Sequence, residues 1–120
     1  MESGYKDIIA QANLALQNND PEGFLQFCSD NIKWTMVGEE SMIGKENVMK
    51  FLEPMRGSQP AKLNMSLTIQ EGNLVASNGS MKMPDDGPEM LFCDIYRFVG
   101  DKIEEIQSYI VEVKDGKKVK

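Results

Sequence analysis

The chain of 120 residues carries a formal net charge of −6, with 19 acidic and 13 basic side chains. This balance argues against partners such as nucleic acids and anionic membrane surfaces, because both are bound through basic patches. No apolar run is long enough to span a bilayer, and the first residues lack the pattern of a signal peptide. We therefore expect a soluble globular protein in the cytoplasm.

The absence of histidine restricts the chemistry further. The sequence has no histidine and only two cysteines, Cys28 and Cys93. Serine–histidine and cysteine–histidine catalysis, histidine-ligated metals and four-cysteine zinc are thereby excluded. Asp85 and Asp86 lie in a Pro- and Gly-rich stretch and indicate a turn rather than a metal pair. No glycine-rich phosphate-binding motif occurs. We predict no metal, no cofactor and two free thiols.

Helical patterns occupy the first half of the sequence. Apolar residues recur at helical spacing over 8–16, which predicts a first helix. Asp20 and Pro21 favour a second helix, because Asp caps helix N-termini and Pro suits the first helical position. A third helix is predicted from Gly44 to about residues 54–57. The apolar positions of the second helix would be Phe24, Leu25, Phe27 and Cys28.

Alternating patterns predict strands elsewhere. A first strand over 32–36 ends near Gly38, and the clearest alternation of the chain follows at 63–70. A turn at 71–73 leads into another long strand that reaches about residue 83. In the strand at 63–70, one face would carry Leu63, Met65, Leu67 and Ile69.

The last part of the chain predicts a β-hairpin. A strand over 93–99, a Gly-Asp pair at 100–101 and a returning strand over 102–113 form its pattern. Alternation places Asp94, Tyr96 and Phe98 on one face of the first strand. An acid that shares a face with two aromatic residues lies at a rim, is paired, or occupies a pocket where its protonation matters.

Two further expectations concern the end of the chain. In the returning strand Tyr109 falls on the face opposite Ser108 and Ile110, which favours core or dimer contacts for the tyrosine. The tail over 114–120 is polar and is expected to be solvated. Helices followed by long strands and short turns predict an α+β fold, in which about three helices wrap an antiparallel sheet.

Four segments resemble the nuclear transport factor 2-like superfamily, with the nearest similarity to its SnoaL-like and ketosteroid-isomerase-like branch. They are Asn19–Leu25, Ser29–Trp34, Gly38–Val48 and the hairpin stretch Tyr96–Ile106. The resemblance implies a single domain over 1–120 with a strongly curved sheet, a conical barrel open at one end onto a pocket, and a homodimer formed through the outer face of the sheet. Members include steroid isomerases, polyketide cyclases, epoxide hydrolases and proteins without catalysis.

The resemblance carries over only part of the catalytic set. The carboxylate base of the isomerases falls at Met36, and their tyrosine donor on the first helix falls near Ala12, so both groups are missing. The stretch 94–98 is similar to the one that holds their second oxyanion donor, which corresponds to Asp94. The acid that epoxide hydrolases need in the last strand falls at Ser108.

Asp94 is thus the candidate catalytic residue. Burial raises the pKa of a carboxyl, and a protonated acid can donate a hydrogen bond to a ligand carbonyl, as in the well-known example of ketosteroid isomerase. The alternative is that Asp94 pairs with a polar neighbour or reaches water at a rim.

Two functions follow, and a structural dimerisation module is a third possibility. The favoured function is a binder of a small hydrophobic or carbonyl-containing molecule in an apolar pocket. The alternative is an isomerase or polyketide-cyclase-like enzyme in which Asp94 is the proton donor or oxyanion stabiliser, but no base is found for it. The predicted ligand-binding residues are Trp34, Met36, Asp94, Tyr96, Ser108 and Ile110.

Overall fold

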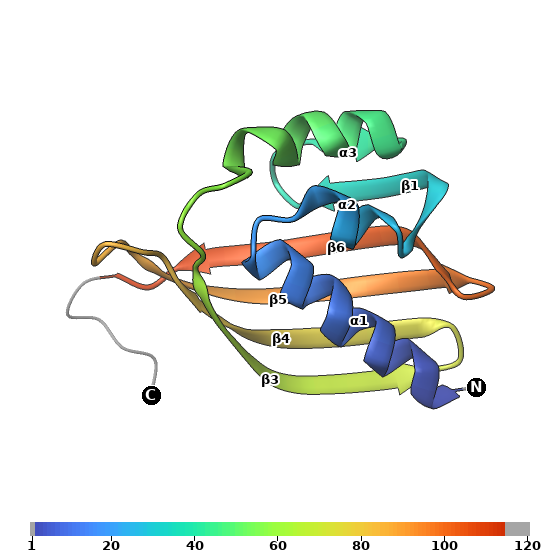
Figure 1. The fold of residues 1–120 in the computed structure, drawn as a ribbon. Helices are drawn as coiled ribbons and strands as arrows, with labels where there is room; N and C mark the ends of the chain where they lie inside the picture. Colours follow the sequence, from blue (N-terminus) through green and yellow to red (C-terminus); the bar gives the residue numbers. More distant parts are fainter. Residues whose placement is uncertain (1, 115–120) are drawn as a thin grey trace.

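The computed structural model describes residues 2–114. In it, a curved six-stranded sheet packs against three helices (Figure 1). The helices are α1 (Glu2–Gln17), α2 (Pro21–Leu25) and α3 (Lys45–Leu52), and a short 3-10 turn, η1 (Glu53–Met55), follows α3. The strands are β1 (Cys28–Met36), β2 (Ser41–Ile43), β3 (Lys62–Glu71), β4 (Leu74–Lys82), β5 (Glu89–Val99) and β6 (Lys102–Glu112). This architecture confirms the predicted α+β class with a strongly curved sheet.

The strand order is β2-β1-β6-β5-β4-β3, so the last strand lies near the middle of the sheet. All neighbouring strands are antiparallel except β1 and β6, which run parallel with Trp34 opposite Ile106 and Met36 opposite Ser108. The predicted antiparallel sheet is confirmed in the other four pairs, and β1 with β6 is its one parallel exception within residues 2–114. The two strands are far apart in the sequence, so no tight turn fixes their relative direction.

The second helix is shorter than predicted. Asp20 caps it by accepting a hydrogen bond from the Gly23 amide at 3.1 Å, as expected, but the helix ends at Leu25. Cys28 already belongs to β1, opposite Ile103 of β6, and the Phe27 carbonyl accepts a bond from the Ile103 amide. Pairing with β6 therefore prevails over the continued helical pattern.

A β-bulge in β3 divides the alternation that predicted one apolar face. Met65 pairs with Gly79, but Leu67 already pairs with Asn78, so one extra residue is inserted between them. Leu63 lies against the cavity described below, whereas Leu67 and Ile69 are 53% and 57% exposed on the opposite side. The prediction of a single apolar face is wrong because a one-residue insertion exchanges the two faces of a strand.

The hydrophobic core fills the end of the molecule near the β5–β6 turn. Phe98 is 1% exposed and stacks on Tyr5 of α1, with ring centroids 4.1 Å apart, and the Tyr5 hydroxyl donates to the Gly100 carbonyl. Ile32 and Ile103 complete this region with no exposure. The other end of the strands is left open, and the cavity lies there.

No helix within residues 2–114 is both long and apolar enough to cross a membrane. The tail that was predicted over 114–120 lies outside the described residues, except for Lys114.

Candidate ligand-binding site

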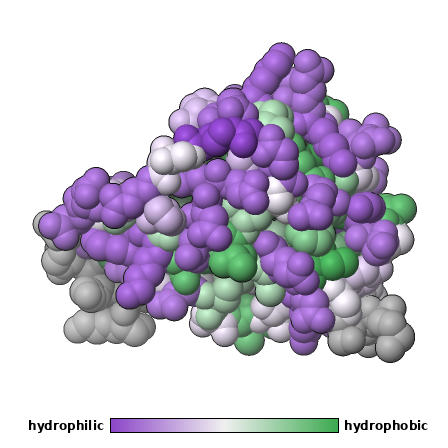
Figure 2. All heavy atoms as spheres, viewed as in Figure 1, coloured by the Kyte–Doolittle hydropathy of each residue, from purple (hydrophilic) through white to green (hydrophobic). Residues whose placement is uncertain are grey.

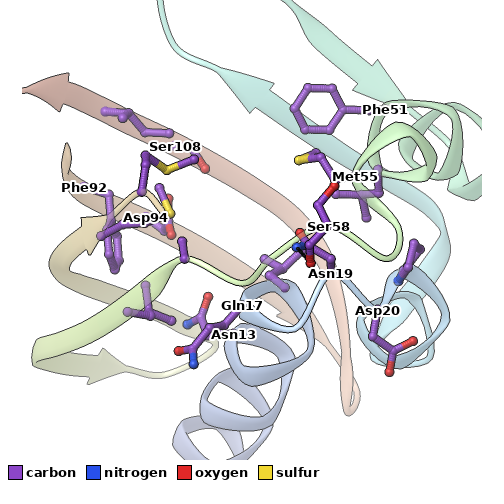
Figure 3. Close-up of a pocket in the computed structure, with 18 of the residues that line it drawn as sticks. Asn13, Gln17, Asn19, Asp20, Phe51, Met55, Ser58, Phe92, Asp94 and Ser108 are labelled. Carbon is purple, nitrogen blue, oxygen red and sulfur yellow. Dashed lines mark hydrogen bonds between the residues drawn. The ribbon is translucent and has the colours of Figure 1, made fainter. Parts of the chain in front are cut away.

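A cavity of about 460 Å³ lies between the inner face of the sheet and the helices (Figure 3). The C-terminal half of α1, the end of α3, and the segments that precede β3 and follow β4 close it. Seen from the helix side, the surface is mainly hydrophilic, with hydrophobic side chains in small groups (Figure 2). The apolar side chains of the lining are Leu16, Pro21, Trp34, Met36, Phe51, Leu52, Met55, Ala61, Leu63, Met81, Met83, Pro84, Phe92 and Ile110. The cavity therefore suits a largely apolar molecule.

Neighbouring strands bring Asp94 and its hydrogen-bond partners together. Asp94 of β5 lies opposite Ser108 of β6, and the Tyr96 hydroxyl donates to Asp94 Oδ2 at 3.3 Å. The Trp34 indole Nε1 donates to Ser108 Oγ at 2.8 Å. An indole N–H can only donate, so this bond leaves the Ser108 hydroxyl proton free for Asp94, its other partner. Two hydroxyls thus support the carboxyl from the sheet side.

Burial dominates the electrostatics of this cluster. Desolvation raises the pKa of Asp94, and the hydrogen bonds from Ser108 and Tyr96 offset only part of that effect. The pKa of Tyr96 is raised well above its ordinary value, first by its own burial and then by the neighbouring Asp94. A neutral Asp94 accepts from the sheet side and can donate toward the cavity.

Five of the six predicted ligand-binding residues line the cavity. They are Trp34, Met36, Asp94, Ser108 and Ile110. Tyr96 does not line it, since its side chain is 2% exposed and its hydroxyl is directed at Asp94. The assignment of Tyr96 to the wall is therefore corrected, because the tyrosine lies behind the carboxyl and can act on a ligand only through it.

A polar residue of α1, Asn13, was missed in the sequence. Asn13 is 6% exposed, lines the cavity, reaches the Tyr96 hydroxyl, and donates to the Met65 sulfur at 3.8 Å. The resemblance points to Ala12, which has nothing to donate, but the adjacent residue supplies an amide. The signal was present in the sequence, because position 13 shares the apolar helix face with Ile9 and Leu16.

The methionine content finds its place in the cavity. Of the nine methionines of the chain, Met36, Met55, Met81 and Met83 are in the lining. Unbranched, polarisable side chains adapt to ligands of different shape. Phe51 and Phe92 add aromatic surface, and Phe51 packs edge-on against Trp34 with ring centroids 5.8 Å apart.

Two connections that form part of the cavity wall are fastened to each other. Asn19, between α1 and α2, donates from Nδ2 to the Ser58 carbonyl at 3.1 Å. Arg56 donates to both carboxylate oxygens of Glu22 at 2.9 and 2.7 Å, and also binds Glu53. The guanidinium lowers the pKa of both glutamates through these hydrogen bonds. The segment after η1 is thereby tied to α2.

The cavity holds few ionisable groups. Among its lining residues only Asp20 and Asp94 can be charged, and the Asp20 carboxylate caps α2 on an exposed turn. Within residues 2–114, no three His, Cys, Asp or Glu side chains lie close enough together to hold a metal ion. Asp94 is therefore the one acid of the lining that is shielded from solvent, although only partly.

The raised pKa of Asp94 predicts how pH acts on stability. Because the native state holds this proton more tightly than the unfolded chain, stability falls as pH rises from the unfolded-state pKa to the native one. Asp94→Asn removes this loss, so the difference in unfolding free energy between variant and parent should move in favour of the variant across that range and then level off. Urea titrations at a series of pH values measure it. A difference that moves in favour of the parent would contradict it.

The curved sheet, three helices and a single-ended cavity define a protein of the nuclear transport factor 2-like class. Within that class the chain belongs to the SnoaL-like domain family, whose model matches residues 9–106. This confirms the resemblance stated from the sequence. No curated protein matches the chain.

Solved structures of this fold agree with the assignment. An NTF2-like protein of unknown function from Cytophaga hutchinsonii is 28% identical, with a TM-score of 0.74 over 92% of this chain and 99% of its own. A putative ketosteroid isomerase from Kribbella flavida is 11% identical, with a TM-score of 0.78 over 98% and 85%. An LEH-like epoxide hydrolase from M. tuberculosis is 15% identical, with a TM-score of 0.80 over 92% and 84%. The last two likenesses establish a shared fold and nothing more.

Proposed function

We propose that this chain is a single SnoaL-like domain, over residues 1–120, that binds a small, largely apolar molecule carrying a carbonyl group. The observation that carries the proposal is a partly buried carboxyl, Asp94, at the wall of an otherwise mostly apolar cavity of about 460 Å³. Burial favours its neutral form, which donates a hydrogen bond to a carbonyl oxygen. Trp34, Met36 and Ile110 would contact the apolar part of the ligand.

Ser108 and Tyr96 have an indirect part in this proposal. Both hydroxyls donate toward Asp94, so the single proton of the neutral carboxyl is directed away from the sheet. Trp34 holds Ser108 through its indole N–H. The cluster would therefore fix the direction in which Asp94 donates, and a ligand would find that donor already positioned.

A second candidate function is an isomerase or polyketide-cyclase-like enzyme. The observation that favours it is Asn13, which adds an amide from α1 near the Asp94–Tyr96 pair. Two donors near one carbonyl oxygen would stabilise developing negative charge. Proton transfer at carbon also requires a base, and the position that resembles the family's base is Met36, which cannot accept a proton. We therefore favour binding without turnover.

Substitution of Asp94 tests both functions. Asp94→Leu should weaken binding of a carbonyl ligand by about 1–3 kcal/mol, because the carbonyl loses its partner inside the cavity. Asp94→Asn should retain most of the affinity, since an amide also donates. Native mass spectrometry of the purified protein gives the mass of a ligand that is bound to it, and calorimetry with that ligand measures the affinity. Equal affinities for Asp94→Leu and the parent would refute the proposal.

The enzyme alternative has its own readout. The parent protein is offered a β,γ-unsaturated ketone, and conjugation of the double bond is followed by ultraviolet absorbance. Our proposal expects no turnover above the buffer rate. Turnover that is lost in Asp94→Leu would establish the enzyme instead.

We also propose that the protein is a homodimer formed through the outer face of the sheet. Leu67, Ile69, Leu74, Tyr109 and Val111 are exposed there by 45% to 61%. Core or dimer contacts were predicted for Tyr109. Because the tyrosine is exposed and takes no part in the core, we assign it to the dimer interface. Apolar surface of this extent favours a partner, and a two-fold axis would cover both copies alike.

Ile69→Lys should shift the protein from dimer to monomer in sedimentation velocity. A lysine there places a charge in the proposed interface, where it would lose its water. Leu14→Lys is the matched control, because Leu14 is 55% exposed on α1, away from the outer face. A monomeric parent, or a dimer that survives Ile69→Lys, would count against the interface.

The cellular setting is a part of the same proposal. Cys28 and Cys93 are both free, in agreement with the predicted thiols, and burial raises the pKa of Cys28 to about 12. A buried thiol with so high a pKa is unreactive, and its side chain serves to pack the core. We propose a cytoplasmic protein without nucleic-acid or membrane partners, as the net charge of −6 favours.

A further inference from the structure

Within residues 2–114, the partly buried acid of the cavity, Asp94, has no cationic partner. No lysine or arginine is among the lining residues, and none contributes to the pKa of Asp94. The groups that face it are Tyr96 on its own strand, Ser108 from β6 and Ser77 from β4, and Asn13 of α1 contacts Tyr96. Of these only Tyr96 can titrate, and burial keeps it neutral. An ionised Asp94 would thus be an uncompensated charge inside the protein.

The walls around this acid suit a positive charge. Trp34, Phe51 and Phe92 are in the lining of the cavity with Asp94. Figure 3 shows Phe92 beside Asp94 and Phe51 of α3 on the other side of the cavity. Aromatic faces attract ammonium groups, most strongly where water is excluded. The excess of 19 acidic over 13 basic side chains also favours the approach of cations over anions.

We propose that the same cavity binds hydrophobic amines, with the ammonium group of the ligand paired to the Asp94 carboxylate. The inference rests on the proposed function only in taking the cavity as a ligand site. The ammonium ion keeps its proton, and Asp94 gives up its own to the solvent when the pair forms. One side chain then serves two ligand classes, donating to a carbonyl when neutral and accepting from an ammonium when ionised.

The two classes should respond to pH in opposite directions. Carbonyl binding needs the protonated acid, so it is strongest below the raised pKa of Asp94 and weakens above it. Amine binding needs the carboxylate, so it strengthens as pH rises through the same pKa. Alkyl ammonium ions keep their charge up to about pH 10, so the ligand itself does not titrate in this range.

Isothermal titration calorimetry with two probes of one shape tests the inference. 2-Aminotetralin and 2-tetralone share their carbon skeleton and differ in the polar group. As pH rises through the raised pKa of Asp94, the amine should gain affinity and the ketone should lose it. Repeated in buffers of different ionisation enthalpy, amine binding below the pKa of Asp94 should release a proton, and ketone binding should release none.

Asp94→Asn gives the second arm of the test. It should weaken amine binding about 10- to 100-fold, as expected for loss of a charged hydrogen-bond partner, and change ketone binding only a few-fold. Asp101→Asn removes the same charge at the exposed β5–β6 turn and should change neither. If Asp94→Asn fails to fold, the proton release of the parent protein decides.

Each outcome separates this inference from the proposed function. An amine affinity that changes neither with pH nor in Asp94→Asn would overturn the inference. Ketone binding without any amine binding would do the same. Amine binding that depends on Asp94, without ketone binding, would support it and overturn the carbonyl proposal. If neither probe bound, both would fail.

Discussion

Phe98→Ala is expected to lower the free energy of unfolding by about 3–5 kcal/mol, the usual cost of removing a buried aromatic ring. Phe98 is 1% exposed, stacks on Tyr5 of α1, and lies on the inner face of β5 at the closed end of the fold. Its removal leaves a cavity and separates α1 from the sheet. Chemical denaturation followed by tryptophan fluorescence measures the change.

Val99→Ala is the matched control for Phe98→Ala. Val99 is the next residue of the same strand, but it is 55% exposed, so its truncation should cost less than about 0.5 kcal/mol. Similar losses in the two variants would mean that the closed end is not packed as described.

Gly79→Ala is expected to destabilise the protein by about 3 kcal/mol, at the upper end of the usual cost of overpacking. Gly79 lies in β4 between Met65 of β3 and Phe92 of β5. A methyl group there would overlap the carbonyl oxygen of Asn64 and touch the Phe92 ring. The strands would have to separate beside the bulge and beside the cavity wall.

Gly4→Ala separates this effect from the general consequence of replacing glycine. Gly4 is in α1, and a methyl group on it meets nothing within 4 Å. The substitution should raise stability by up to about 1 kcal/mol, because alanine favours helix. Thermal and urea unfolding of both variants give the comparison. A neutral Gly79→Ala would show that β3 and β4 are less closely apposed.

The features that local pattern dictates were predictable from the sequence. The β5–β6 hairpin turns at Gly100 and Asp101 as expected. Because the period of a strand is two residues, alternation placed Asp94 and Tyr96 on one face of β5, and Ser108 and Ile110 on one face of β6. The start of α2 followed from the capping preference of Asp20.

What the sequence left out depends on partners far away in the chain. The bulge in β3 leaves no clear mark in the alternation, because Leu67 is as apolar as Leu63. The parallel pairing of β1 with β6 has no sequence signal, because no tight turn connects the two strands. The apolar helix face of Asn13 can be read from the sequence, but its partner Tyr96 cannot, because only folding brings β5 and α1 together.

The central place of the last strand determines when the cavity can form. The Trp34–Ser108 bond joins residues 74 positions apart, and both neighbours of β6 come from earlier in the chain. Before β6 docks, β1 and β5 have open edges, and closure of so long a loop makes this step slow. The cavity should therefore be among the last features to form during folding, and a ligand that binds it would act on the completed fold alone.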